Sequence, residues 1–275
     1  MIWHCANFDF DLMTEPVIMG ILNITPDSFS DGGEHHDHQT AYAYAHEMLA
    51  GGARIIDVGG ESTRPGSDEV AETEELARVL PVVSRLAADG VAVSIDTRHV
   101  RVAEACIEAG AAIVNDVSGF RDPRMRELVA ASDVGCIVMH MLGEPKSMQN
   151  NPHYDDVVAE VSDYLVEQAA LLEAEGVTTN RICIDPGPGF GKNFQHNLAL
   201  LKAIPRLTGL GYVVMAAFSR KRFIGDLTGI SSPAERAAAS AIVAAWAALH
   251  GAGILRVHDV RETVDALKIL RYLED

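Results

Sequence analysis

Eight short apolar runs alternate along this chain with longer segments that have the apolar spacing of helices. The runs show little alternation of apolar and polar residues, which is typical of strands buried on both faces. They begin at residues 17, 53, 91, 111, 135, 181, 212 and 254. Helical patterns cover residues 40–52, 69–90, 100–110, 155–176 and 232–251, and several of them end at a glycine. Pro81 lies inside 69–90, so we expect it to kink or split that helix.

This repeated order of strand and helix predicts the α/β class and, within it, a (β/α)8 barrel, the TIM barrel fold. The chain has 275 residues, and such a barrel typically takes about 250. An open, doubly wound sheet is the alternative, but the regular spacing, with no strand left over, favours the barrel. The sequence contains no internal repeat, linker or low-complexity tract, so we expect residues 1–275 to form a single domain.

Composition narrows the cellular setting and excludes some classes of partner. A formal net charge of −17 argues against nucleic-acid binding and against adhesion to anionic membranes. The first residues lack the pattern of a signal peptide, and the longest apolar stretch, 237–255, is interrupted by Gly251 and Gly253. The four cysteines form no C-x-x-C pair. We therefore expect a soluble, cytoplasmic protein with reduced, buried thiols.

Polar residues follow almost every predicted strand. In a TIM barrel the active site is built from the carboxyl ends of the strands, so these residues are candidates for a site. In chain order they are Asn23, Asp57, Asp96, Asn115, His140, Asp185, Ser219 to Lys221, Arg256 and His258. For Asp57 and His140 we expect a purely local hydrogen-bonding role.

The remaining candidates are of two chemical kinds. Asp96, Asn115 and Asp185 offer acceptors and an amide, and a carboxylate can accept two parallel N–H bonds from a flat aminopyrimidine edge. A site of this kind rejects analogues that lack those groups by roughly 10⁴–10⁵-fold. The second kind is cationic and falls on the last two strands, where TIM barrels often hold phosphate. Its members are Arg220, Lys221, Arg222, Arg256 and His258.

Two other segments resemble known motifs without matching them. The run "IDPGPGFGKN" (184–193) is no Walker A loop, because Pro186 stands where the first glycine belongs, and its alternating glycines do not fit G-x-G-x-x-G. We interpret it as a turn after Asp185, whose glycines let the backbone pass close to a flat ligand beside Phe190. The run "EHHDH" (34–38) has adjacent rather than spaced ligands, so we expect a solvated loop and not a metal site.

The chain strongly resembles the dihydropteroate synthase family of bacterial folate biosynthesis, which binds pterins. The matching segments include "MGILNITPDSFSDGG" (19–33), "IDVGGESTRPG" (56–66) and "DPGPGFGKN" (185–193). The others are "SIDT" (94–97), "VNDVSG" (114–119), "MHMLGEPKSMQ" (139–149), "SRK" (219–221) and "RVHDV" (256–260). They occur in order over about residues 15–270. Their joint appearance makes the resemblance specific.

The resemblance implies a reaction and a role for each candidate. A dihydropterin methyl diphosphate would condense with 4-aminobenzoate by a dissociative route, giving dihydropteroate and diphosphate, with Asp96, Asp185, Lys221 and Arg256 as catalytic residues. The pterin would contact Asp96, Asn115, Met139, Asp185 and Lys221. Diphosphate would bind Arg64, Arg256 and His258, with Mg²⁺ on Asn23. The aminobenzoate would lie near Phe29, Thr63, Pro65, Phe190 and Ser219, under loops 25–33 and 62–68. The resemblance also implies a homodimer and inhibition by sulfonamides that compete with 4-aminobenzoate.

The chain departs from the family's usual residues at two positions, where Pro188 and Arg222 stand instead of the common Phe and Ser. Two rival functions are also kept. One is a pterin-binding methyltransferase that moves a methyl group from methyltetrahydrofolate to a corrinoid protein. The other is a paralogue that binds pterin without synthase activity, and Pro188 is its support.

Overall fold

Eight parallel strands close into a barrel, in the order β10-β3-β4-β5-β6-β7-β8-β9. The computed structural model describes residues 1–24, 34–61, 70–144 and 146–274. The predicted (β/α)8 fold is therefore confirmed, and the open sheet is excluded. The barrel strands are β3 (Val17–Asn23), β4 (Ile55–Gly59), β5 (Ala92–Asp96), β6 (Ile113–Asp116), β7 (Gly135–Met139), β8 (Ile182–Asp185), β9 (Val213–Ala216) and β10 (Ile254–Val257).

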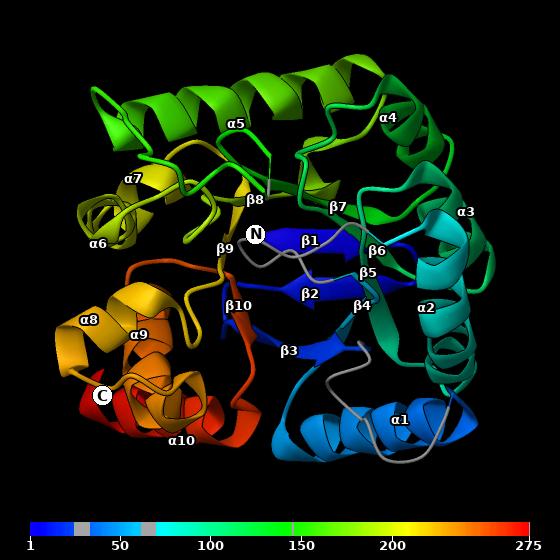
Figure 1. The fold of residues 1–275 in the computed structure, drawn as a ribbon, viewed down its shortest axis with the longest axis horizontal. Coiled ribbons are helices and arrows are strands. Elements are labelled where there is room, and N and C mark those ends of the chain that lie inside the picture. The colour runs from blue at the N-terminus through cyan, green and yellow to red at the C-terminus, as the bar shows by residue number, and fades with distance from the viewer. Residues whose placement is uncertain (25–33, 62–69, 145, 275) are drawn as a thin grey trace.

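Helices surround the barrel, as Figure 1 shows. They are α1 (Glu34–Gly51), α2 (Glu72–Ala88), α3 (Val100–Glu108), α4 (Pro123–Ala130), α5 (Val157–Ala174), α6 (Phe194–Lys202), α7 (Ile204–Thr208), α8 (Arg222–Thr228), α9 (Ala237–Leu249) and α10 (Val260–Glu274). Two 3₁₀ helices, η1 (Thr179–Arg181) and η2 (Pro233–Arg236), precede β8 and α9. No helix in the described ranges has the length and apolar content needed to cross a membrane.

One local prediction was wrong, and one alternative of another is excluded. Residues 34–38 form the first turns of α1 instead of a solvated loop, because that run contains no helix breaker and continues into the predicted helix. Pro81 does not split its helix, since α2 runs unbroken from Glu72 to Ala88. Val79 and Val82 on either side of Pro81 are buried against the barrel, and this packing outweighs the lost backbone hydrogen bond.

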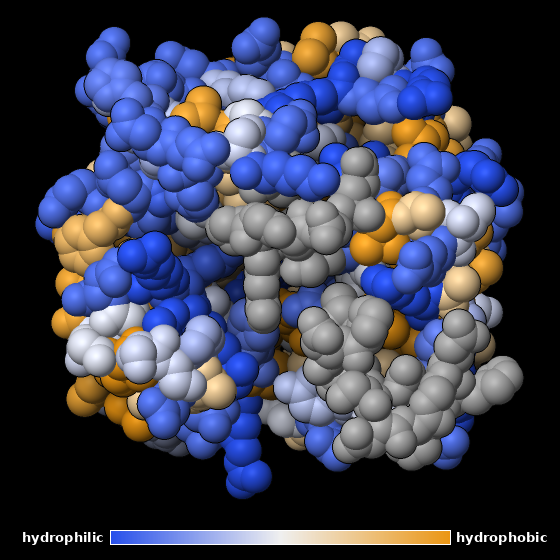
Figure 2. All heavy atoms as spheres, in the orientation of Figure 1, coloured by the Kyte–Doolittle hydropathy of each residue, from blue (hydrophilic) through white to orange (hydrophobic). Residues whose placement is uncertain are grey.

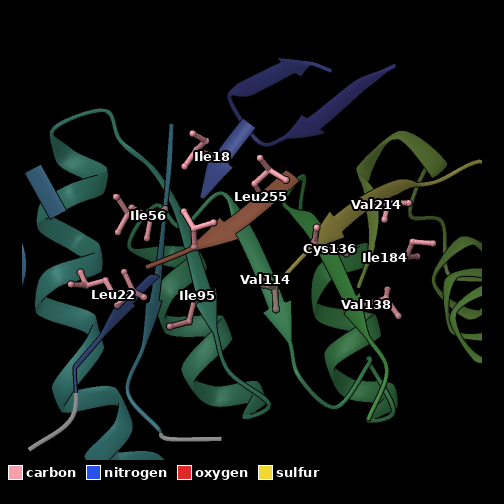
Figure 3. Packing of buried hydrophobic residues seen from close by; sticks show 14 of the residues in the cluster. Ile18, Leu22, Ile56, Ile95, Val114, Cys136, Val138, Ile184, Val214 and Leu255 are labelled. Carbon is pink, nitrogen blue, oxygen red and sulfur yellow. The ribbon is translucent and has the colours of Figure 1, made fainter. Parts of the chain in front are cut away.

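Successive strand residues point alternately into the barrel and toward the helices. On β3, Ile18 and Leu22 belong to the layer between strands and helices, whereas Val17 and Met19 belong to the barrel interior. Figure 3 shows this outer layer, in which Ile56, Ile95 and other alternate residues leave the strands on the helix side. The alternation fixes which residues at the strand ends face the central axis.

A two-stranded hairpin closes the end of the barrel where the strands begin, here called the amino end. It consists of β1 (Ile2–Cys5) and β2 (Phe8–Asp11), which the sequence patterns did not reveal. Trp3 and Phe10 of the hairpin are almost fully buried in the same cluster as the residues of the barrel interior. The Trp3 indole Nε1 donates a hydrogen bond to the Arg181 carbonyl at 3.0 Å. The opposite end, here called the carboxyl end, is left for the site.

The cysteines are as predicted. Cys5, Cys106, Cys136 and Cys183 are all unpaired and buried. Burial is the main cause that raises the pKa of each thiol above its ordinary value. These thiols are therefore packing residues and not nucleophiles.

Candidate active site

Five polar side chains from five strand ends line one pocket at the carboxyl end of the barrel. They are Asp96, Asn115, Asp185, Lys221 and Arg256. Apolar groups complete the wall, namely Val117, Met139, Pro188, Phe190 and Ala217. The structure thus brings together seven of the residues predicted from the sequence, including Met139 and Phe190. The free space among them is about 20 Å³.

Arg256 lines the pocket and pairs with two carboxylates. Its Nη2 donates to Asp96 Oδ2 at 2.6 Å, and its Nε donates to Asp57 Oδ2 at 2.6 Å. Asp57 also accepts from the Asn115 amide nitrogen at 3.2 Å. Asp57 is fully buried behind the pocket wall. One carboxylate therefore holds two pocket residues, and its partners lie 58 and 199 residues away.

The predicted local role for Asp57 was therefore wrong. The sequence did carry a signal, since Asp57 is an acidic residue within the otherwise apolar strand β4. What it could not show is that β3, β4, β5, β6 and β10 lie close enough for one buried carboxylate to serve two distant partners.

Burial sets the charge balance of the pocket. It raises the pKa of Asp185 above its ordinary value, while the Gly187 amide and Lys221 oppose the rise. Burial likewise raises the pKa of Asp96, and Arg256 opposes it. For Arg256 burial lowers the pKa, but the carboxylates of Asp57 and Asp96 outweigh burial and raise the pKa overall. Arg256 therefore stays charged. The protonation of Asp96 and Asp185 depends on the charges and hydrogen-bonding groups that approach them.

A second, larger cavity of about 660 Å³ lies at the amino end, between the start of β3 and helix α10. Its walls are mostly apolar, and its charged residues, such as Arg54 and Lys268, are exposed at the rim. Buried polar groups converge in the smaller pocket instead. Since convergent buried polar groups, rather than volume, give a site its chemistry, the smaller pocket is the candidate active site.

The glycine-rich loop after β8 is shaped by its protein neighbours. Asp185 Oδ1 accepts from the Gly187 amide at 2.8 Å, and Gly187 has φ +61°. A Cβ on Gly187 would lie 1.9 Å from the His140 carbonyl oxygen, and one on Gly191 would lie 2.5 Å from the Leu142 Cβ. The predicted close approach of the backbone is present. However, these two glycines lie against the segment that follows β7, and they do not border open space for a ligand.

Lys192, at the end of this loop, turns inward. It is 3% exposed, and its Nζ lies 2.8 Å from His140 Nδ1 and 2.9 Å from the Phe190 carbonyl oxygen. Burial and Lys192 lower the pKa of His140 to about 3, so the imidazole is neutral and its Nδ1 can accept this bond. Burial lowers the pKa of Lys192 to about 7. Lys192 and His140 therefore fix the loop that carries Phe190, a role the sequence did not reveal.

Lys221 follows β9, and its side chain lies against the glycine-rich loop. Its Nζ is 4.5 Å from the centre of the Phe190 ring, and its side chain runs past Gly189, where a Cβ would lie 3.3 Å from Lys221 Cδ. Nearby, Ser219 Oγ accepts from the His258 amide at 3.2 Å and lies 3.1 Å from His258 Nδ1. The predicted residues Ser219 and His258 are thus in contact with each other, beside the pocket rather than in its wall.

Two further predicted members of the cationic cluster do not line the pocket. Arg220 forms an ion pair with Asp259, its Nε lying 2.9 Å from Asp259 Oδ2. Arg222 is exposed and begins α8. The local cation density therefore comes from Lys221 and Arg256, with His258 nearby.

Asn23, the predicted metal ligand, stands beside Asp96. A Cβ on Gly59 would lie 3.6 Å from Asn23 Oδ1 and 3.7 Å from Asp96 Oδ2, so this glycine leaves space shared by two oxygen donors. The described residues contain no group of three or more acidic, His or Cys ligands. One amide oxygen near a carboxylate fits Mg²⁺, which keeps several waters and takes few protein ligands. Phe29, Thr63, Arg64 and Pro65 lie outside the described residues.

Comparisons with known proteins agree on one family. The family described as pterin binding enzyme matches residues 19–258. The dihydropteroate synthase of Neisseria meningitidis serogroup C is 47% identical over 97% of this chain and 95% of its own length. A Xanthomonas albilineans dihydropteroate synthase solved with 4-aminobenzoic acid is 45% identical, with a TM-score of 0.93 over 99% of this chain and 98% of that one. The Burkholderia cenocepacia enzyme complexed with 7,8-dihydropteroate is 42% identical, with a TM-score of 0.90 over 99% and 96%.

Proposed function

We propose that this chain, which belongs to the dihydropteroate synthase family, carries out that family's reaction in the pocket at the carboxyl end of the barrel. A dihydropterin methyl diphosphate condenses there with 4-aminobenzoate, and the products are 7,8-dihydropteroate and diphosphate. The observation that carries the proposal is the convergence of five polar side chains from five strand ends on one pocket. The relatives solved with 4-aminobenzoic acid and with 7,8-dihydropteroate are alike in fold over nearly the whole chain.

The acidic side of the pocket suits the heterocycle. Asp96 and Asp185 can each accept N–H bonds from a pterin, and the Asn115 amide can both donate and accept. Val117, Met139 and Phe190 pack together and offer apolar surface for the flat ring. In this arrangement the carboxylates recognise the edge of the ring and the apolar group contacts its face.

Binding requires an exchange of partners at Asp96. Its Oδ2 is held by Arg256 at 2.6 Å, so this oxygen cannot accept a pterin N–H while that bond persists. The pterin N–H groups replace the guanidinium, which stays tethered through Nε to Asp57. Arg256 is then free to turn its other nitrogen atoms toward the diphosphate, for which its planar fork is well suited.

The cationic side of the pocket suits the leaving group. Lys221 and Arg256 supply two charges where the diphosphate oxygens become more negative as the C–O bond breaks. Asn23 would hold Mg²⁺ beside them, and the ion would supply further neutralisation of the diphosphate charge. His258, directly after β10, extends this side. Arg64 is assigned here by the family resemblance alone.

The reaction then follows a dissociative order. The C–O bond to diphosphate breaks first and leaves a pterin methyl cation, which the carboxylates of Asp96 and Asp185 stabilise by their negative charge. The amine nitrogen of 4-aminobenzoate attacks this carbon, forms the C–N bond and gives up a proton to solvent. Phe190 and Ser219 are placed by the proposal near the aminobenzoate, together with Thr63 and Pro65.

The two rival functions are not favoured. A corrinoid-dependent methyltransferase has no diphosphate to stabilise and no need for Lys221 and Arg256 in one pocket. A paralogue without activity drew its support from Pro188, which lines the pocket without displacing any of the five polar groups. Relatives with the synthase name reach 47% identity over nearly the full chain.

A homodimer is proposed for the assembly. Three neighbouring helices, α8, α9 and α10, expose large apolar side chains, which are Leu227, Ile242, Leu249, Ile269, Tyr272 and Leu273. Figure 2 shows apolar atoms along this lower left edge of the molecule. Large apolar side chains exposed on adjoining helices support a protein–protein interface there. Sedimentation analysis should give twice the mass of one chain, and a monomer at micromolar concentration would contradict the proposal. The cytoplasmic location stays a prediction.

One assay tests the function. Purified protein is incubated with the pterin diphosphate, 4-aminobenzoate and Mg²⁺, and dihydropteroate is measured by chromatography. We expect product in the complete mixture and none without the pterin diphosphate. Binding of both substrates without product would favour the inactive paralogue. Methyl transfer from methyltetrahydrofolate, offered as an alternative substrate, would favour the corrinoid-dependent enzyme.

A further inference from the structure

A buried arginine lies behind the turn that carries Lys221. Arg236 is the last residue of η2 and is 7% exposed. The turn, Ser219–Lys221, connects β9 to α8 and therefore stands directly at the rim of the pocket. Arg236 does not itself line the pocket.

The guanidinium of Arg236 binds backbone carbonyls of two segments. Nη1 donates to the carbonyl oxygens of Arg220 and Lys221 at 3.0 and 3.4 Å. Nε donates to the Ile230 carbonyl at 3.0 Å, and Nη2 donates to the Ser231 carbonyl at 2.5 Å. The carbonyls of Arg220 and Lys221 belong to the two peptide groups on either side of the Lys221 Cα. Arg236 therefore restrains the backbone on both sides of this lysine.

The turn needs such restraint because its conformation is unfavourable. Arg220 has φ +57°, in the left-handed region that residues with a Cβ rarely adopt. Its amide donates to Ser240 Oγ at 2.9 Å, and its side chain is paired with Asp259. Gly225 leaves room for the guanidinium, since a Cβ there would lie 2.5 Å from Arg236 Nη2. Several elements thus hold one strained turn, and strain of this kind is typical of functional sites.

We infer that Arg236 is a positioning residue for Lys221. By fixing both flanking carbonyls it sets the direction in which the lysine side chain leaves the backbone, past Gly189 and over the Phe190 ring. The inference rests on the proposed function of Lys221 at the diphosphate. It assigns Arg236 no contact with substrate.

The chain contains a matched control for a purely structural role. Arg181 is 6% exposed, and its guanidinium also donates to backbone carbonyls, those of Val129 and Val134. It lies in η1 at the start of β8, far along the barrel from the strand ends that build the pocket. Replacing either arginine by lysine keeps the charge and loses the planar fork, so both variants should lose similar amounts of stability.

The experiment compares Arg236→Lys with Arg181→Lys, each alone and combined with Lys221→Ala. Unfolding is measured by chemical denaturation, and kcat and KM are measured for both substrates under conditions where each variant is folded. We expect Arg236→Lys to lower kcat/KM by roughly 10–100-fold, since misplacing a catalytic group by about 1 Å can cost 10²-fold. Arg181→Lys should stay within about 2-fold of the parent. In the Lys221→Ala background, Arg236→Lys should add less than about 2-fold.

Three results would overturn the inference. Equal activities of the two arginine variants would leave Arg236 a structural residue. Fully multiplicative effects of Arg236→Lys and Lys221→Ala would mean that Arg236 acts independently of the lysine. Normal turnover of Lys221→Ala alone would remove the proposed role of Lys221, and this inference with it. If Arg236→Lys does not fold, Ser240→Ala replaces it, because it releases the Arg220 amide on the same turn. A loss of about 3-fold or more that vanishes without Lys221 is then expected, and an unchanged rate would again overturn the inference.

Discussion

The two ends of the barrel are made of the same eight strands, but one end carries apolar side chains and the other carries polar and charged ones. At the amino end, Trp3 and Phe10 of the hairpin pack with Met19 and other apolar residues in one buried cluster. At the carboxyl end, Asp57, Asp96, Asn115, Asp185 and Arg256 are buried or half-buried within hydrogen-bonding distance of one another or of the loops. The hairpin closes one end, and the other is left to charged groups.

This contrast separates the residues that keep the chain folded from those proposed to act on a substrate. Apolar burial lowers the free energy of the folded state, by roughly 25 cal/mol per Å². Buried carboxylates and an arginine must be desolvated, and pairing them offsets that cost only in part. Substitutions at the amino end should therefore mainly lower the stability of the fold. Substitutions at the carboxyl end should mainly lower the activity.

The largest expected effect is at the amino end. Trp3→Ala removes a fully buried side chain and the hydrogen bond to Arg181, so the free energy of unfolding should fall by about 3–5 kcal/mol. Chemical denaturation measures this change, and Ile2→Ala on the exposed face of the same strand is the control. The folded fraction should keep its turnover within about 2-fold. A large loss of activity per folded molecule would contradict the separation.

The next effect concerns the carboxyl end. Lys221→Ala should lower turnover by roughly 10²–10³-fold, the scale for losing one preorganised electrostatic group. Steady-state kinetics measures this, with Lys202→Ala, on the surface of α6, as the control. Unfolding should change by less than about 1 kcal/mol, since a lysine head group at a pocket wall adds little packing. A near-normal rate would mean that Lys221 does not stabilise the leaving diphosphate.

The pH dependence of stability should depend on one buried carboxyl group beside the barrel. Glu75 of α2 is buried, and burial raises its pKa from 4.5 to about 7, with Thr97 opposing the rise. A raised carboxyl pKa means that the stabilising neutral form is complete below pH 4.5 and is lost as the pH rises through about 7. Glu75→Gln should therefore reduce the fall in unfolding free energy between pH 5 and pH 8 by about 2–3 kcal/mol. Glu104→Gln, exposed on α3, should leave the pH dependence unchanged, and an equal effect of both would refute the assignment.

The smallest effect is expected at Asp57. Asp57→Asn keeps the shape and can still accept from Arg256, but it replaces a charge-assisted bond by a neutral one of about half the strength. Affinity for the pterin diphosphate should fall roughly 10-fold, or about 1.4 kcal/mol. Calorimetric titration measures this, and Asp163→Asn on the surface of α5 is the control. Unchanged affinity would mean that the charged bond from Asp57 to Arg256 is not needed for binding.

Much of this architecture was open to prediction from the sequence. The eight runs and the polar residues after them depend on local pattern, and barrel geometry then brings Asp96, Asn115 and Asp185 together. The hairpin escaped because "FDFD" is short and half charged, and its stability comes from Trp3 and Phe10 packing inside a barrel formed by distant residues. Tertiary contact outweighed local preference there.

The orientation of individual charges was not open to prediction. Arg220 was predicted to be a site cation, yet it pairs with Asp259. Lys192, for which no role was predicted, turns inward to His140. Asp57 looked local and instead joins strands far apart in the chain. Which partner a charged side chain selects depends on desolvation and on distances that exist only after folding.

The bond between Arg256 and Asp57 spans 199 residues of sequence, from the second barrel strand to the last. During synthesis the ribosome delivers β4 long before β10, so the cation side of the pocket cannot exist on a growing chain. An incomplete product, or one truncated before residue 254, would carry the acids and lack the arginine that neutralises them. The chain can therefore bind substrate only after β10 has closed the barrel. Ligand binding would then show that the whole chain has been synthesised and has folded.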